Sequence, residues 1–132
     1  IYGGAAGGMA AGLAAFVNGK LVSGIEYFLD AVHFDDALEK ADLVITAEGS
    51  LDEQTLEGKG PFGVAVRANK KKVPVIALAG QVPLKITKKM QNYFDVVFPI
   101  THAPSSVEEA IINTSADLTR TSCELGNLLA FH

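Results

Sequence analysis

Apolar residues follow two different patterns along this chain of 132 residues. Up to residue 41 they recur every three or four positions, as at Met9, Leu13, Phe16 and Val17, which is the spacing of one helix face. From residue 42 onward, short continuous apolar runs alternate with longer amphipathic stretches. Continuous runs are typical of strands that are covered on both faces. We therefore expect strands at 43–46, 75–79 and 96–100.

The stretches between these runs carry helix signals. Ser106 with Glu109, and Ser23 with Glu26, have the spacing of a capping box. His33 lies between two short helices and is expected to be a turn residue. We expect one helix after the first glycines, ending at Asn18-Gly19, and two short core-facing helices between 23 and 41. Three further helices are expected at 61–72, 84–92 and 106–130. The alternation of strand and helix predicts right-handed βαβ units and a parallel sheet.

Composition and charge exclude several classes of protein. Eleven basic against fifteen acidic residues give a net charge of −4, and no broad basic face is expected, which argues against a protein that binds duplex nucleic acid. No apolar run reaches the length of a membrane span. The single cysteine, Cys123, cannot form an internal disulfide and favours a reducing compartment, so we expect a cytoplasmic protein. The start lacks an initiator methionine and a charged leader, so we expect the middle of a longer chain.

A long polar segment, residues 47–60, follows the first expected strand and precedes a helix. It is longer than the usual connection in such units, and long polar loops more often carry function. In a parallel α/β sheet this segment and the loops at 80–83 and 101–105 all follow the carboxyl ends of strands. Folds of this class bind their ligands at that edge of the sheet. Each of these loops leads into a helix N-terminus, which favours anions. Phosphate is therefore the first expected ligand.

The residues of this segment suggest phosphoryl chemistry. Asp52 and Glu48 are the carboxylates best placed to hold Mg²⁺ or to accept a proton. Lys59 can hold a phosphate or a carboxylate as a point charge, and Gln54 and Thr55 can bond substrate hydroxyls or their own backbone. The sequence has no Walker loop, no His/Cys metal cluster and no nucleophile elbow.

Glycines mark a second candidate region near the start of the chain. Gly4, Gly7 and Gly8 precede the first helical stripe. Small residues there allow close approach of either another backbone or a ligand phosphate, and the pattern alone does not decide between the two. Gly49 and Gly58 are further candidates for binding substrate or phosphate, within the polar segment.

Several motifs in register resemble the bacterial glycerate kinase family. They are GGAAGGMAAGL from residue 3, SGIE from residue 23, DLVITAEG from residue 42, Asp52-x-Gln54-Thr55 with Gly58-Lys59, and PVIALAG from residue 74. The resemblance covers essentially the whole chain and corresponds to the C-terminal part of such an enzyme. It implies a Rossmann-like domain over 42–132 and a glycine-rich helical segment of the interdomain region over 1–41. Ser50 stands where the family commonly has arginine, which removes one expected anion contact.

The resemblance also implies an activity and its partners. Family members use ATP and Mg²⁺ to phosphorylate D-glycerate and are not P-loop enzymes. It implies that the site includes Glu48, Asp52, Gln54, Thr55 and Lys59 and is completed by a missing N-terminal part of the same enzyme.

Two alternatives stay open beside this interpretation. The 132 residues by themselves can be a non-catalytic α/β module that binds an anion or a partner, or a part of a different Rossmann-like enzyme acting on sugar phosphates. An incomplete sheet also exposes an edge strand, so a homodimer is conceivable.

Overall fold

The computed structural model describes residues 4–53 and 58–131. Its elements are, in order, η1 (Ala5–Gly8), α1 (Met9–Val17), α2 (Gly24–Ala31), α3 (Phe34–Leu38), β1 (Val44–Ser50), α4 (Gly60–Lys70), β2 (Val75–Gln81), α5 (Lys88–Gln91), β3 (Val96–Pro99) and α6 (Val107–Leu129).

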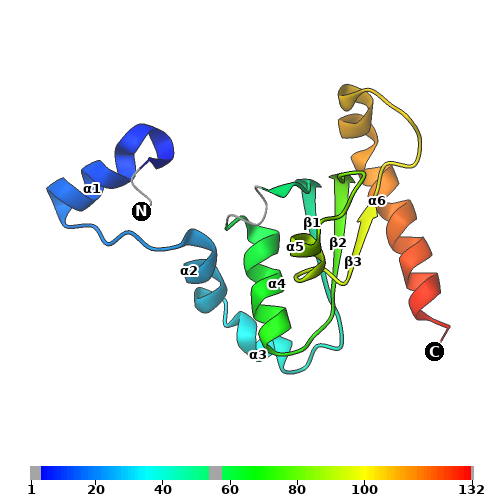
Figure 1. The fold of residues 1–132 in the computed structure, drawn as a ribbon, viewed down its shortest axis with the longest axis horizontal. Coiled ribbons are helices and arrows are strands. Elements are labelled where there is room, and N and C mark those ends of the chain that lie inside the picture. Colours follow the sequence, from blue (N-terminus) through cyan, green and yellow to red (C-terminus); the bar gives the residue numbers. More distant parts are fainter. Residues whose placement is uncertain (1–3, 54–57, 132) are drawn as a thin grey trace.

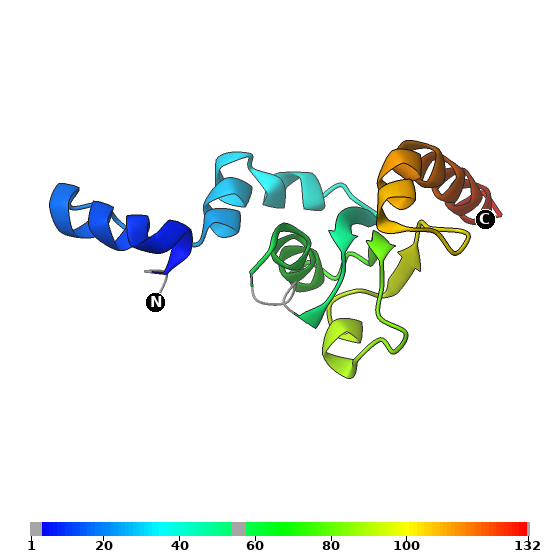
Figure 2. The same ribbon diagram turned by 90° about the horizontal axis from the view of Figure 1, so that it is seen from above.

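The strands form a parallel sheet in the order β1-β2-β3. Val44 pairs with Val75 and Glu48 with Ala79, whereas Ile76 pairs with Val96. Helix α4 lies on one face of this sheet and α6 on the other, as Figures 1 and 2 both show. The predicted α/β class, a Rossmann-like parallel sheet flanked by helices, is confirmed.

Strand β2 is the centre of the core. Val75, Ala77 and Ala79 face α4, and Ile76 and Leu78 face α6. All five are at most 7 % exposed. Such a strand requires cover on both sides, which is why its sequence is a continuous apolar run. The α4 side also buries Met90 and Phe94, and the α6 side buries Leu125.

Several element boundaries differ from the prediction. β2, expected to end at Ala79, continues to Gln81, so the first two residues of the expected 80–83 loop are strand. β1 continues to Ser50, so the first residues of the segment expected to be a loop, including Glu48, are in fact strand, because they keep the pairing with β2. The helix expected over 84–92 is reduced to α5. The hydroxyl of Thr87 accepts a hydrogen bond from the Met90 N–H at 3.3 Å and caps the helix there, so residues before 88 stay irregular.

Arg67 of α4 joins the sheet to the two short helices before it. Its guanidinium lies 2.6 Å from Asp30, 2.7 Å from Glu26 and 3.1 Å from Asp35, while its own side chain is 11 % exposed. The hydrogen bonds to Asp30 and Glu26 raise the pKa of Arg67 above its usual value. Arg67 is therefore always charged and holds α2 and α3 beside α4.

The N-terminal helix does not bury its apolar stripe. Met9, Leu13, Phe16 and Val17 are each at least 52 % exposed, and α1 has no buried residue. Both ribbon views show η1 and α1 standing apart from the sheet (Figures 1 and 2). The helix itself and its end at Asn18, in the left-handed conformation, are as predicted. The expectation that the two following helices face the core holds for Leu29 and Leu38 but is wrong for Phe28 and Val32, which are exposed.

At the start of α2 only half of the predicted capping box forms: the Ser23 hydroxyl accepts a hydrogen bond from the Glu26 N–H, whereas the Glu26 carboxylate pairs with Arg67. Ser106 and Glu109 form a reciprocal capping box at the start of α6, and His33 is a turn residue before α3. Cys123 is exposed on α6. Within residues 4–53 and 58–131, no helix is long and apolar enough to cross a bilayer. The division of the chain at residue 41 stays a prediction.

The contact between α2 and α4 depends on Gly63. A Cβ atom at this position would lie 2.4 Å from Cγ1 of Ile25. We expect Gly63→Ala to reduce the free energy of unfolding by about 1–3 kcal/mol through overpacking. Gly126→Ala is the matched control, since a Cβ there meets nothing within 4 Å in α6, and it should stabilise the helix by roughly 0.5–1 kcal/mol. Urea unfolding of both variants measures the difference, and equal stability of the two would contradict this packing.

The capping box predicts a pH dependence. The Ser106 N–H and hydroxyl lie 2.9 and 3.0 Å from Glu109 and lower the pKa of its carboxyl below the ordinary 4.5. The stabilisation is present above the unfolded-state pKa and is lost as pH falls through the lower folded-state pKa. Glu109→Gln should therefore lower the melting temperature at about pH 6 and converge with the wild type as pH falls below 4.5. Glu108→Gln, which removes the same charge from the same turn, should show a smaller change, and a gap for Glu109→Gln that persists at about pH 2 would contradict the assignment.

Candidate functional site

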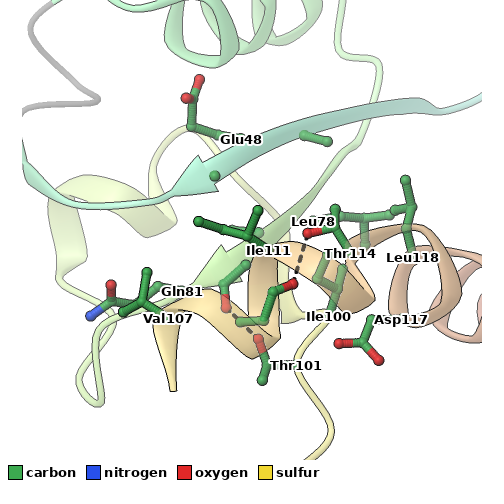
Figure 3. Close-up of a pocket in the computed structure, with 15 residues that line it drawn as sticks. Glu48, Leu78, Gln81, Ile100, Thr101, Val107, Ile111, Thr114, Asp117 and Leu118 are labelled. Atoms are coloured by element: carbon green, nitrogen blue, oxygen red, sulfur yellow. Dashed lines mark hydrogen bonds between the residues drawn. The ribbon is translucent and has the colours of Figure 1, made fainter. Parts of the chain in front are cut away.

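The candidate carboxylates lie at the carboxyl end of β1. Side chains alternate between the two faces of a strand, and Glu48 pairs with Ala79, whose side chain packs on the α4 side. The Glu48 side chain therefore points toward the α4 face, and Figure 3 shows it on the opposite side of β1 from Ile111 and Thr114. This is the face on which α4 begins.

Asp52 and Lys59 are brought together although seven positions separate them. Lys59 Nζ lies 3.8 Å from Asp52 Oδ1, and the two side chains are 43 % and 47 % exposed. A pair this exposed contributes little to stability, so it is better regarded as a local arrangement of charge than as a structural link. Gly58, with φ of 104°, makes the turn just before Lys59.

The helix N-termini at this edge are not equivalent. At α6 the side chains of Ser106 and Glu109 occupy the cap, and Glu108 adds a second negative charge in the first turn. α5 has only four residues and is capped by Thr87. At α4 no side chain caps the N-terminus, and Lys59 stands at the cap position with Pro61 in the first turn. Of the three helix starts expected to favour anions, α4 alone among the described elements combines a cation with an uncapped end.

The other site residues expected from the sequence are not brought together with Asp52, Lys59 and the start of α4. Gly4, Gly7 and Gly8 belong to the N-terminal segment, which both ribbon views place apart from the sheet (Figures 1 and 2). Gln54 and Thr55 lie outside the described residues. Gly49 is at the end of β1, two residues before Leu51, which is buried.

The ends of β1 and β2 approach closely at two glycines. A Cβ atom on Gly80 would lie 2.8 Å from the carbonyl oxygen of Gly49, so a larger residue at position 80 would force these strand ends apart. The hydroxyl of Thr101 donates a hydrogen bond of 2.6 Å to the Gly80 carbonyl oxygen. Gly80 at the end of β2 therefore contacts both Gly49 at the end of β1 and Thr101 after β3. These contacts join the carboxyl ends of the three strands.

A cavity of about 430 Å³ opens beside these glycines on the α6 face. Figure 3 shows side chains from α6 and from the strand ends around it. The sequence analysis did not single out this cavity or its residues Thr101, Thr114 and Asp117. A signal was present: Thr114 and Asp117 follow Ile111 at intervals of three residues, so they put polar groups on the same face of the helix as that apolar residue.

Asp117 is the buried polar residue of this cavity. It is 5 % exposed, and its Oδ1 lies 2.7 Å from Nδ1 of His102. The approach is close, but its direction does not make a hydrogen bond, and Oδ1 has no hydrogen-bond partner among the residues described. The two side chains therefore form an ion pair when the imidazole of His102 is protonated, without a hydrogen bond to Oδ1 from the described residues.

The acidic residues at the edge suit a hard metal ion. No group of three or more His, Cys, Asp or Glu residues that could hold a metal occurs in the described ranges. A dedicated protein cage is thus absent from this part of the chain. Mg²⁺ is commonly held by one or two carboxylates and the phosphates of a substrate, so the hard oxygens of Asp52 and Glu48 fit that ion.

Comparisons with known proteins agree on one family. The model of the glycerate kinase family matches residues 2–130. A glycerate kinase from Bacillus cereus is 49 % identical over 81 % of this chain, and a glycerate 2-kinase from Escherichia coli is 37 % identical over 96 %. A crystal structure assigned to glycerate kinase 2 from Salmonella typhimurium LT2 superposes with a TM-score of 0.70 at 41 % identity over 97 % of the chain.

The fold is that of an α/β domain with a parallel sheet, and the chain belongs to the glycerate kinase family. It spans only part of each relative: 28 % of the Bacillus cereus protein, 33 % of the Escherichia coli protein and 32 % of the Salmonella typhimurium chain.

Proposed function

We propose that this chain is the C-terminal portion of an enzyme that transfers the γ-phosphoryl group of ATP to a hydroxyl of D-glycerate. The observation that carries the proposal is the combination of Asp52, Lys59 and the uncapped start of α4 at the carboxyl edge of the sheet. Family membership supports the substrate and the nucleotide.

The proposed reaction needs three things from these residues. The glycerate hydroxyl oxygen forms a bond to the γ-phosphorus while the bond from that phosphorus to the β-phosphate bridging oxygen breaks, and ADP leaves. One carboxylate, Asp52 or Glu48, accepts the hydroxyl proton, and the other carboxylate is the metal-holding group. Lys59 and the first N–H groups of α4 hold the negative charge of the phosphoryl group. Mg²⁺, when bound, would neutralise phosphate charge.

The site is proposed to include residues beyond this cluster. Gly49 and Gly58 allow phosphate or substrate to approach the backbone, and Gln54 and Thr55 bond substrate hydroxyls. Gly4, Gly7 and Gly8 are proposed to contribute from the glycine-rich segment, which requires a different placement of that segment relative to the sheet. We propose that a further N-terminal part of the same enzyme completes the site, and that the protein acts in the cytoplasm.

The carboxylates provide the first test. In the full-length protein that carries this sequence, Asp52→Asn should lower kcat for D-glycerate by about 100-fold or more, as loss of a proton acceptor or metal ligand does. Asp42→Asn, an exposed carboxylate before β1, is the control and should act as wild type. A coupled ADP-release assay measures both. Wild-type turnover by Asp52→Asn would refute the assignment of the site.

A magnesium titration separates the two roles. If Asp52 holds the metal ion, raising the Mg²⁺ concentration should partly restore Asp52→Asn and leave Glu48→Gln unrestored. The reverse result assigns the metal ion to Glu48 and the proton to Asp52.

A further prediction concerns the 132 residues alone. We expect no ATP-dependent turnover of D-glycerate by this chain, because we propose that it holds only part of the site. The same assay, with circular dichroism to verify that the chain is folded, gives the answer. Sustained turnover by the isolated chain would contradict the requirement for further segments, and binding of phosphate without turnover would match a non-catalytic anion-binding module.

A further inference from the structure

The cavity on the α6 face differs chemically from the cluster of Asp52 and Lys59. Its walls are formed by apolar side chains, among them Leu78, Ile100, Ile111 and Leu118. Asp117 gives this lining a negative charge, whereas the Glu48 carboxylate points to the α4 face, and no lysine, arginine or histidine from the described part of the chain lines the cavity. A phosphate or a carboxylate is therefore disfavoured here, and a neutral group with an apolar face is favoured.

The size of the cavity supports the same conclusion. At about 430 Å³ it falls in the range of sites that enclose a small organic molecule or a large part of a cofactor. Glycerate is small and carries a carboxylate, so it matches neither the volume nor the charge. A nucleoside, with a flat apolar base and a neutral sugar, matches both.

Asp117 adds a directional requirement. Its carboxylate is enclosed in protein and lies 2.7 Å from His102 Nδ1, which makes an ion pair when the imidazole is protonated, while no described residue donates a hydrogen bond to Oδ1. A buried carboxylate beside a single imidazole still has acceptor capacity, so it stabilises a ligand that brings a hydroxyl donor. Ribose hydroxyls are donors of this kind.

The position of the cavity relates it to the proposed phosphoryl-transfer site. Backbone of Gly49 and Gly80 lines it at the strand ends, and the Glu48 side chain leaves the same strand on the other face. A molecule lying across the ends of β1 and β2 would place its apolar part over α6 and its far end toward the start of α4, where Lys59 stands.

We propose that this cavity binds the nucleoside part of ATP, with the base against Ile111 and Leu78 and a ribose hydroxyl donating to Asp117. The proposal rests on the proposed kinase function and adds the location of the nucleotide. The triphosphate then crosses the glycines at positions 49 and 80 and reaches the Lys59 side.

The test fills the cavity by a substitution on α6. Ala110 lines the cavity, whereas Ala116 is exposed on the same helix and lies outside the cavity lining. Ala110→Met in the full-length protein should weaken binding of ADP and of adenosine at least tenfold in isothermal titration calorimetry. Ala116→Met, the same change at the control position, should stay within about twofold of wild type. Binding of inorganic tripolyphosphate should be unchanged in both variants, since the phosphate side is not altered.

The outcomes separate this proposal from the function itself. ADP affinity unchanged in a folded Ala110→Met protein overturns the cavity assignment, even if glycerate is phosphorylated. Loss of ADP and adenosine binding in Ala110→Met, with no activity toward glycerate in the wild type, supports the cavity and overturns the substrate. Loss of tripolyphosphate binding together with ADP binding would indicate a general disruption and overturn the nucleoside assignment.

Discussion

The burial of β2 on both faces is the constraint on which the rest of this structure depends. Five consecutive side chains from Val75 to Ala79 are almost completely inaccessible, so α4 must cover one face and α6 the other. Once both helices are in place, the connections that lead into them start at the same edge of the sheet. The polar residues of those connections therefore lie near one another at this edge. Folding does not require any contact between them.

The same edge presents two chemically distinct sides. On the α4 side, Lys59, Asp52 and an uncapped helix start provide charge and donors for anions. On the α6 side, Ser106 and Glu109 cap the N-terminus of the helix. An apolar cavity, with the buried carboxylate of Asp117 in its lining, lies beside this helix. A ligand that is charged at one end and apolar at the other is complementary to this division. This is the physical basis on which the phosphates and the nucleoside of ATP are proposed to occupy opposite faces.

Arg67 couples the two short helices to α4. It is located on α4, the helix whose first turn is proposed to bind phosphate, and it holds Glu26, Asp30 and Asp35 from α2 and α3. Residues of α1, by contrast, leave their apolar stripe exposed. The chain spans about a third of the length of the relatives that it matches, and the surface of α1 is thus compatible with contacts to segments that those longer proteins possess.

Most of the local structure and the resemblance to the family could be predicted from residues that are close together in the chain. Continuous apolar runs marked the three parallel strands, and the spacing of Ser106 and Glu109 marked the start of α6, because both signals come from residues that are neighbours in the chain. Motif spacing also identified the glycerate kinase family. The polar segment after β1 was recognised from its composition alone.

Which polar side chains lie close together could be learned only from the folded structure. Sequence spacing did not indicate that Glu48 is still in a strand and points toward α4, since that depends on its register with Ala79. Nor did it indicate that Asp117 lies beside His102, because their proximity arises from the packing of α6 on the sheet. The shortened helix at Lys88 follows from a side-chain cap at Thr87 that the apolar periodicity does not contain. Burial, register and long-range contacts are properties of the folded chain, and these determine the site.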